Sequence, residues 1–204
     1  MNDAPQATHL ADYEAPNFSV ERVELAFNLN EEDTIVRAAL SLQRQASGPL
    51  VLDGEDLALE SILIDDNALP SDAYTVSPSS LTIPDVPDEF TLRTDVRIQP
   101  QNNTKLEGLY KSSGNFCTQC EAEGFRRITY FLDRPDVTSV YSVRIEADRA
   151  KYPVLLSNGN LVDQGTADQG RHWVEWQDPY PKPSYLFALV AGDLAVAEDR
   201  FTTA

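Results

Sequence analysis

The chain has few of the residues that usually build metal and catalytic sites. Its 204 residues include two cysteines, two histidines and one methionine. Two cysteines cannot form the disulfide framework of a small secreted protein, so we expect a reducing compartment and place the protein in the cytoplasm. No apolar run approaches the roughly 20 residues that a membrane-spanning helix needs. The N-terminus, MNDAPQATHLADYEAP, carries Asp3 and lacks the apolar core of a secretory signal.

Positive charge is also scarce. Lys and Arg number 16 against 33 Asp and Glu, which gives a formal net charge of −17. Residues 1–100 hold 5 basic and 19 acidic side chains, and residues 101–204 hold 11 and 14. Such acidity repels nucleic acid and anionic membrane surfaces, so we expect neither as a partner. The acidic half could face a basic partner, but a solvated surface that keeps the chain soluble is the better interpretation.

Helical periodicity is missing, because no segment holds a 3.6-residue period for three turns. Apolar and polar residues instead alternate over 23–29, 36–42, 90–98 and 141–147, and 57–64 is a further apolar run that ends in Asp65-Asp66-Asn67. The polar turn at 30–33 joins the first two as a β-hairpin. The chain is therefore predicted to be all-β and sandwich-like, with mostly antiparallel strands. One short helical turn is expected at 133–136, with Asp133 as its cap and Pro135 in its first position.

The C-terminal third carries further strand signals. Residues 154–157, then Asn158-Gly159, then Leu161-Val162 form the strongest hairpin signal, because Asn-Gly supplies the positive φ angles of a type I′ turn. Strands are also expected at 172–176 and 185–190. We interpret residues 1–204 as a single domain, with a soft sub-boundary at the polar connector 100–104. A chain of this length can bury a sizeable core.

The segment 108–135, GLYKSSGNFCTQCEAEGFRRITYFLDRP, has neither helical nor strand periodicity and lies between strand-rich regions. Loops on a rigid sheet are where binding groups concentrate, so a functional site is expected here. Cys117 and Cys120 form a C-x-x-C pair, but a structural zinc site needs four ligands. His9 and His172 are far away in sequence and complete no ligand set. A thioredoxin-type role needs a βαβ setting that is not predicted, so we interpret the cysteines as reduced and packed.

Motifs that complete a reaction are missing as well. The sequence has no Ser-His-Asp arrangement that can be argued, no Gly-rich phosphate loop and no H-E-x-x-H motif. We therefore expect no catalytic residue and no bound metal in this chain, and we interpret His9 and His172 as structural. Gln119, Glu121 and Glu123 in the central segment would, in an arbitrary loop, simply face water.

A family resemblance changes the interpretation of that segment. The chain closely resembles the N-terminal domain of bacterial aminopeptidase N, a zinc-dependent, gluzincin-type family, through the runs CTQCEAEGFRRITYFLDRPDV, YEAPNFSVERVELAFNLN, YPVLLSNGN and HWVEWQDPYPKPSYLFALVAGD. The resemblance covers essentially the whole chain and implies a saddle-shaped β-domain. In the family the zinc ligands, the general base and a G-x-M-E-N motif belong to a following catalytic domain. Met1 is the only methionine here, so we expect the chain, which ends at Ala204, to stop where that domain begins.

The resemblance also implies a role for two residues. In the family, a Q-C-E motif supplies a Gln and a Glu that bind the free α-amino group of the substrate, and the matching positions here are Gln119 and Glu121. An α-ammonium has a pKa of about 8, so it is largely cationic at neutral pH and attracts a carboxylate. The implied partners are peptides bound through their N-terminus and the parent's own catalytic domain, with zinc as the parent's cofactor. The isolated chain is expected to be inactive. Glu123 has no matching role and should pair with Arg126 or Arg127.

A second interpretation stays open at this point. The chain could be a stand-alone β-sandwich module without catalytic activity that binds a protein or a carbohydrate through its acidic half. The two hypotheses differ in the gene sequence that they expect downstream of the Ala204 codon. An open frame that encodes H-E-x-x-H supports the aminopeptidase, whereas a natural stop codon supports the module.

Overall fold

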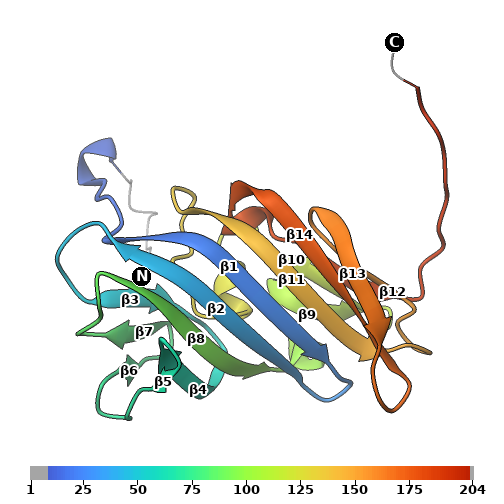
Figure 1. Cartoon of the computed structure of the whole chain (residues 1–204), viewed down its shortest axis with the longest axis horizontal. Helices are drawn as coiled ribbons and strands as arrows, with labels where there is room; N and C mark the ends of the chain where they lie inside the picture. The colour runs from blue at the N-terminus through green and yellow to red at the C-terminus, as the bar shows by residue number, and fades with distance from the viewer. Residues whose placement is uncertain (1–8, 203–204) are drawn as a thin grey trace, which may run out of the picture.

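The computed structural model describes residues 9–202, and its largest element is an eight-stranded sheet in the order β13-β14-β11-β1-β2-β8-β4-β5 (Figure 1). Neighbouring strands are antiparallel except β1 and β11, which run parallel. The strands are β1 (Phe18–Leu29), β2 (Thr34–Arg44), β4 (Ala58–Ile64), β5 (Asn67–Ala68), β8 (Glu89–Ile98), β11 (Thr138–Asp148), β13 (Asn160–Thr166) and β14 (Arg171–Pro183).

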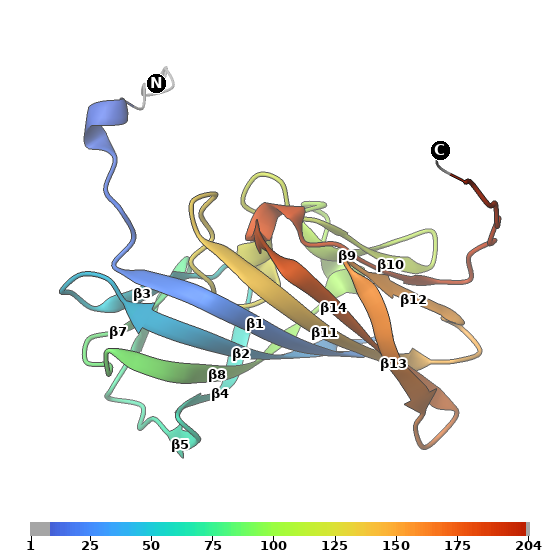
Figure 2. The ribbon, with the colours of Figure 1, turned by 45° about the horizontal axis from the view of Figure 1, so that its top comes forward.

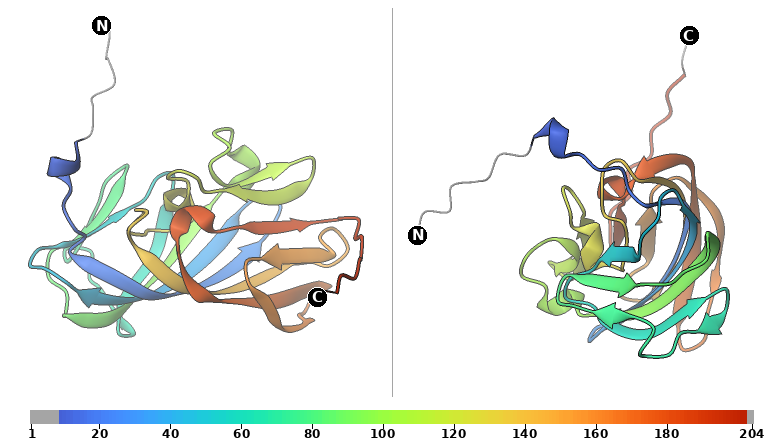
Figure 3. Two further views of the ribbon diagram at one scale, coloured as in Figure 1. Left: turned by 90° about the horizontal axis from the view of Figure 1, so that it is seen from above. Right: turned by 90° about the vertical axis from the view of Figure 1, so that its left-hand side faces the viewer.

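Two smaller sheets lie on one side of the large sheet, towards opposite ends of its long axis (Figures 1 and 3). The four-stranded sheet has the order β12-β15-β10-β9, and the three-stranded sheet has the order β3-β7-β6. Their strands are β3 (Leu50–Asp53), β6 (Thr75–Val76), β7 (Ser80–Ile83), β9 (Gly108–Ser112), β10 (Asn115–Gln119), β12 (Val154–Ser157) and β15 (Leu189–Gly192).

Short 3₁₀-helices connect some of the strands. They are η1 (Leu10–Asp12), η2 (Pro100–Asn102), η3 (Phe125–Arg127) and η4 (Ser184–Leu186). Residues 9–17 and 193–202 leave the sheets towards opposite ends of the molecule (Figure 2). Within residues 9–202, no helix is long and apolar enough to cross a membrane.

The core lies between the large sheet and the two small ones. Along β1 the side chains of Val23, Leu25 and Phe27 are buried, whereas that of Glu24 is exposed, as period-2 alternation requires. Phe125 lies in the middle of the core, with ring centroids 5.0 Å from Phe131 and 5.3 Å from Phe187. Burying one such side chain contributes about 1.5–3 kcal/mol, so Phe125 holds η3 against the core.

The all-β, mostly antiparallel prediction is confirmed. The alternating runs 23–29 and 36–42 form the hairpin β1–β2, and 57–64, 90–98 and 141–147 lie in or largely within β4, β8 and β11. The sub-boundary at 100–104, within the single domain 1–204, stays a prediction; η2 occupies the first part of that connector.

The expected helical turn at 133–136 is wrong. Residues 135–136 form a plain turn, and the nearest helical segment is η3, several residues earlier. The reason is that the Asp133 carboxylate bonds inward, to the backbone amide of Arg126 in η3, rather than to the residues that follow it. Asp133 therefore does bond a helical amide, but one that precedes it in the chain.

The predicted hairpin around Asn158-Gly159 is also wrong. β12 pairs with β15 in the four-stranded sheet, whereas β13 pairs with β14 in the large sheet. The turn is thus a corner at which the chain passes from one sheet to the other. The Asn158 side chain fixes this corner, because its amide donates to the Leu186 carbonyl at 3.1 Å and its oxygen accepts from the Ala188 amide at 2.7 Å.

The strand expected at 185–190 is confirmed only in its last residues. Residues 184–186 form η4, and β15 begins at Leu189. The Ser184 hydroxyl donates to Asp133 at 2.6 Å, and Phe187 stacks on Phe27 with ring centroids 6.0 Å apart. These two inward contacts turn the chain before it can extend along the sheet.

Candidate functional site

Strand β10 positions the first candidate residue. Phe116 in β10 is fully buried and packs on Tyr152, with ring centroids 5.0 Å apart. β10 pairs with β9 on one side and with β15 on the other. Because the strand is held by two neighbours and by the core, its last residue, Gln119, lies at a fixed place while its side chain is exposed.

The second candidate residue lies in the turn after β10, which we define as residues 120–124. The Glu121–Ala122 peptide bond in this turn is cis. The ends of the turn are buried, at Cys120 and Gly124, and Glu121, Ala122 and Glu123 between them are exposed. The Gly124 amide donates to the Cys120 carbonyl at 2.8 Å and closes the turn. Because both ends are buried and joined, the turn presents the Glu121 side chain to solvent.

Gln119 and Glu121 lie together at this edge. The Gln119 amide nitrogen donates to the Glu121 backbone carbonyl at 3.1 Å. Within residues 9–202, no side chain pairs with the Glu121 carboxylate and no donor reaches the Gln119 amide oxygen. The two predicted residues thus offer one carboxylate and one neutral oxygen, both accessible from outside.

Glu123 behaves differently from Glu121, although both are exposed. Its carboxylate lies 3.5 Å from the Arg126 guanidinium, which confirms the predicted ion pair. Arg127 makes a separate cluster with Glu55, Asp56 and Glu107. Of the two carboxylates in the turn, only that of Glu121 is left to bind something else.

The two cysteines are free thiols in different environments. Cys120 is buried, and burial raises the pKa of its thiol, which disfavours the thiolate needed by a nucleophile or a metal ligand. Cys117 is half-buried in β10. The Nε2 atom of His172 lies 2.7 Å from the Tyr152 carbonyl oxygen, a structural contact, and His9 is exposed near the N-terminus. In the part of the chain that the structure describes, no group of three or more His, Cys, Asp or Glu side chains is placed to hold a metal ion.

Asp133 is the residue near the site that sequence reasoning placed wrongly. It is 3% exposed, and its carboxylate accepts from both the backbone amide and Nε of Arg126, each at 3.1 Å. Desolvation alone would lower the pKa of Arg126, but the hydrogen bonds to Asp133 and the nearby charges outweigh it and the pKa is raised. The one signal in the sequence was an acidic residue directly after the apolar run at 130–132, where a buried charge needs a partner.

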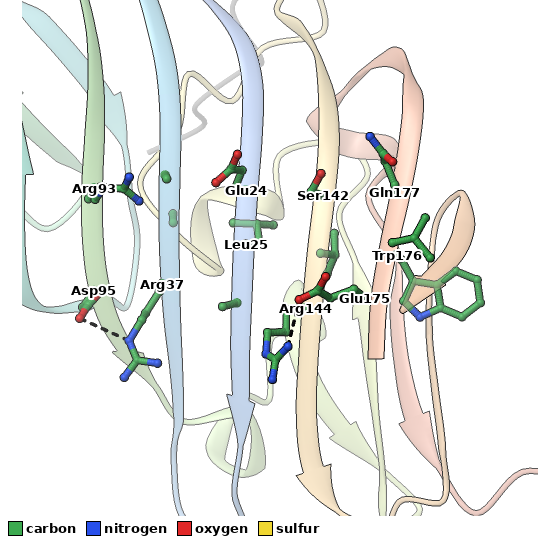
Figure 4. Close-up of a pocket in the computed structure, with 15 residues that line it drawn as sticks. Glu24, Leu25, Arg37, Arg93, Asp95, Ser142, Arg144, Glu175, Trp176 and Gln177 are labelled. Atoms are coloured by element: carbon green, nitrogen blue, oxygen red, sulfur yellow. Dashed lines mark hydrogen bonds and ion pairs between the residues drawn. The ribbon is translucent and has the colours of Figure 1, made fainter. Parts of the chain in front are cut away.

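Two sizeable hollows lie elsewhere on the molecule. One, of about 560 Å³, is on the outward face of the large sheet and is lined mainly by side chains of β1, β2, β8, β11 and β14 (Figure 4). Four of its charged groups form two ion pairs, Arg37 with Asp95 at 3.6 Å and Arg144 with Glu175 at 2.9 Å. The other, of about 590 Å³, lies beside the loop that contains η2. Neither is lined by Gln119 or Glu121.

The two oxygen acceptors at the turn suit a cation with several N–H donors. A carboxylate accepts charge-assisted hydrogen bonds, and an amide oxygen beside it adds a neutral acceptor. The edge therefore offers acceptor groups to which a ligand with N–H donors could bind.

Comparison with known proteins relates the chain to a family of peptidases. Residues 19–186 match the model of the peptidase M1 N-terminal domain. Aminopeptidase N of Caulobacter vibrioides is 58% identical over 203 residues, which are 98% of this chain and 23% of that protein. The chain thus spans about a quarter of the length of this relative.

Solved structures agree on the fold. The structure of Legionella pneumophila aminopeptidase A in complex with aspartic acid superposes with a TM-score of 0.88 at 38% identity, over 92% of this chain and 23% of that one. A variant of the M1 zinc metallopeptidase of Deinococcus radiodurans, bound to a Tyr-Ser-Ala substrate, gives a TM-score of 0.74 at 16% identity, over 86% and 42%. At that identity the likeness concerns the fold alone. Because the family model matches most of the chain, the chain belongs to the peptidase M1 N-terminal domain family.

Proposed function

We propose that this chain is the N-terminal domain of a zinc metallo-aminopeptidase that removes single residues from peptide N-termini. In this proposal Gln119 and Glu121 bind the α-ammonium of the substrate. The observation that carries it is the exposed Glu121 carboxylate, which lacks an ion-pair partner among residues 9–202 although Arg126 lies close enough to pair with Glu123. The named relatives, which are aminopeptidases, support the reaction class.

The physical basis is the charge of a free peptide N-terminus. An ammonium offers three N–H donors, and a carboxylate at a distance of about 2.8 Å binds it roughly twice as strongly as a neutral acceptor would. The Gln119 amide nitrogen is engaged with the Glu121 carbonyl, so its oxygen is oriented away and accepts. An internal stretch of peptide offers no ammonium, and this difference would restrict binding to chain ends.

The reacting groups belong, in this proposal, to the parent's catalytic domain. What this chain contributes, in the same proposal, is binding and orientation of the substrate. Fixing the amino end fixes where the first peptide bond lies, and correct placement of a reacting bond alone can supply a large part of a rate enhancement. The catalytic domain and peptide substrates are the proposed partners, and the cytoplasm is the proposed location.

The test uses the complete protein with Glu121→Ala. Loss of the carboxylate should lower kcat/KM for aminoacyl-nitroanilides by roughly 10²-fold or more, equivalent to about 3 kcal/mol. Glu123→Ala is the matched control, because it removes an exposed carboxylate two residues away that already has a partner. Near wild-type activity of the Glu121 variant would remove this residue from the site.

The isolated chain gives a second test of the same proposal. Residues 1–204 alone should hydrolyse no aminoacyl-nitroanilide, since the reacting groups lie outside them. Measurable turnover by a preparation of the isolated chain, abolished by a substitution within it, would show that the chain has its own catalytic residues and would overturn this division of labour.

A further inference from the structure

The turn 120–124 packs so closely against its surroundings that position 124 has no room for a side chain. A Cβ atom on Gly124 would lie 2.3 Å from the Gln119 carbonyl oxygen, 2.9 Å from the Gly108 nitrogen and 3.1 Å from the Cys120 Cα. All three are backbone atoms, so none can rotate out of the way. Only glycine fits at position 124 without moving the turn.

The residue opposite Gly124 is restricted in the same way. Gly108, the first residue of β9, has φ +72°, and a Cβ atom there would lie 2.7 Å from Arg127 Cβ and 3.0 Å from the Gly124 carbonyl oxygen. The positive φ already favours glycine. Two glycines on separate segments therefore bring the end of the turn into backbone contact with β9.

The buried Asp133 carboxylate holds Arg126, the second residue of η3. Arg126 bonds Asp133 through its backbone amide and through Nε, and the second Asp133 oxygen accepts from the Ser184 hydroxyl at 2.6 Å. The Asp133 amide in turn donates to the Asp53 side chain at 3.1 Å. These contacts join η3 to η4 and to β3, so the end of the turn cannot shift without breaking buried hydrogen bonds.

The exposed part of the turn has no such support. The one hydrogen bond that links the two candidate residues is the one from the Gln119 amide to the Glu121 carbonyl. The position of the Glu121 carboxylate therefore depends on the buried ends of the turn, Cys120 and Gly124.

We propose that Gly124, in contact with Gly108 and anchored through the Arg126–Asp133 pair, is the positioning residue that sets where the Glu121 carboxylate meets an α-ammonium. This inference rests on the proposed function. An alanine at position 124 must displace the turn from Gln119 and β9, and a misplacement of about 1 Å can cost roughly 10²-fold. The effect should fall on binding of the amino group and leave the rest of the ligand unaffected.

The experiment measures inhibition of the complete protein by two probes. One is leucine, and the other is 4-methylpentanoate, which is leucine without its amino group. Gly124→Ala should raise the Ki of leucine at least about tenfold and leave that of 4-methylpentanoate unchanged. Gly114→Ala is the control for replacing a glycine near the site, because Gly114 lies between β9 and β10 and has no atom within 4 Å of its Cβ position. Its φ is +86°, whereas that of Gly124 is −81°, so the control carries backbone strain but no steric clash. It should change neither Ki.

A second variant keeps the backbone as it is. Asp133→Asn replaces one of the carboxylate oxygens that hold Arg126 and Ser184, and should raise the Ki of leucine about threefold, again without an effect on 4-methylpentanoate. Asp136→Asn is its control, because Asp136 pairs with Arg134 at 2.7 Å. If a thermal unfolding scan shows that Gly124→Ala does not fold, the Ki values of the Asp133→Asn variant test the positioning role instead.

The outcomes separate the two proposals. Glu121→Gln is included in the same assay, and an unchanged Ki of leucine in that variant overturns the proposed function itself. A raised Ki for Glu121→Gln together with unchanged values for Gly124→Ala and Asp133→Asn overturns only the positioning role. Equal increases for both probes would mean that the glycine supports the domain as a whole, and would overturn it too.

Discussion

The two small sheets cover the same face of the large sheet, yet they are assembled in different ways. The three-stranded sheet is local, because β3, β6 and β7 all come from residues 50–83. The four-stranded sheet combines residues 108–119 with residues 154–157 and 189–192. Of the two, the four-stranded sheet carries the candidate turn. A local stretch is enough to cover a core, whereas the edge that presents Gln119 and Glu121 is fixed by segments far apart in sequence.

The largest expected effect concerns the cores beneath the two sheets. Leu81→Ala in β7 and Leu109→Ala in β9 each remove a fully buried side chain and should cost roughly 2–5 kcal/mol of unfolding free energy. Urea unfolding measures this loss. The Ki of leucine should stay unchanged in the Leu81 variant and rise in the Leu109 variant, because Leu109 follows the glycine that contacts the turn. A raised Ki for Leu81→Ala would mean that the three-stranded sheet also determines the position of the candidate turn.

The next largest loss of stability is expected where Arg127 links the three-stranded sheet to the four-stranded sheet. The Arg127 side chain is 10% exposed and pairs with Glu55 and Asp56 after β3 and with Glu107 before β9. Arg127→Met leaves Glu55 and Glu107 without their cation, while Asp56 keeps its pair with Lys105 at 3.0 Å. The substitution should cost about 1–3 kcal/mol at low salt, and less in 1 M salt. The control is Arg37→Met, whose side chain is 61% exposed and should cost about 0–1 kcal/mol. Equal losses of unfolding free energy for the two variants would mean that the Arg127 cluster does not stabilise the contact between the two small sheets.

A smaller effect depends on pH. Glu31, in the β1–β2 turn, accepts from the Tyr152 hydroxyl at 2.6 Å and pairs with Lys111 of the four-stranded sheet. The bond from Tyr152, helped by Lys111, lowers the pKa of Glu31 below its usual 4.5 despite partial desolvation. A lowered folded-state pKa contributes stability above pH 4.5 that is lost as the pH falls through the folded value. Glu31→Gln should cost up to about 1 kcal/mol at pH 7, and urea unfolding should show this difference shrinking at pH 3. A difference that is constant with pH would contradict the assignment.

The smallest effect is expected within the turn itself. Glu123→Ala breaks an exposed ion pair, so kcat/KM of the complete protein should change less than about threefold and the unfolding free energy by less than about 0.5 kcal/mol. Steady-state kinetics beside Glu121→Ala provide the measurement. A loss as large as that of Glu121→Ala would mean that the two carboxylates act together.

Alternation along the chain was enough to predict most of the long strands of the large sheet and the hairpin β1–β2. The runs at 23–29 and 36–42 have one buried and one solvated face, so their pattern is visible without knowledge of any partner. The identities of Gln119 and Glu121 came from the resemblance of their motif, and their role in binding stays a prediction. The structure adds that the two residues lie together and are exposed.

The features that could not be predicted depend on contacts between distant residues. Asn158-Gly159 has the composition of a hairpin, but the Asn158 side chain bonds residues 186 and 188, which send the flanking strands into different sheets. Asp133 resembled a local cap, but its partners are Arg126 and Ser184. In both cases a short polar side chain that suits a local turn is used for a long-range bond instead.

The parallel pairing of β1 with β11 has a consequence for synthesis on the ribosome. Residues 22–28 of the first strand pair with residues 140–146. At about 5–20 residues per second, roughly 6–24 s pass between the emergence of one partner and that of the other. During this interval one edge of an apolar strand is open to other nascent chains, and contacts of such long sequence separation also form slowly. We expect chaperone dependence in the cell to be set by this seam, while the hairpin β1–β2 can form early.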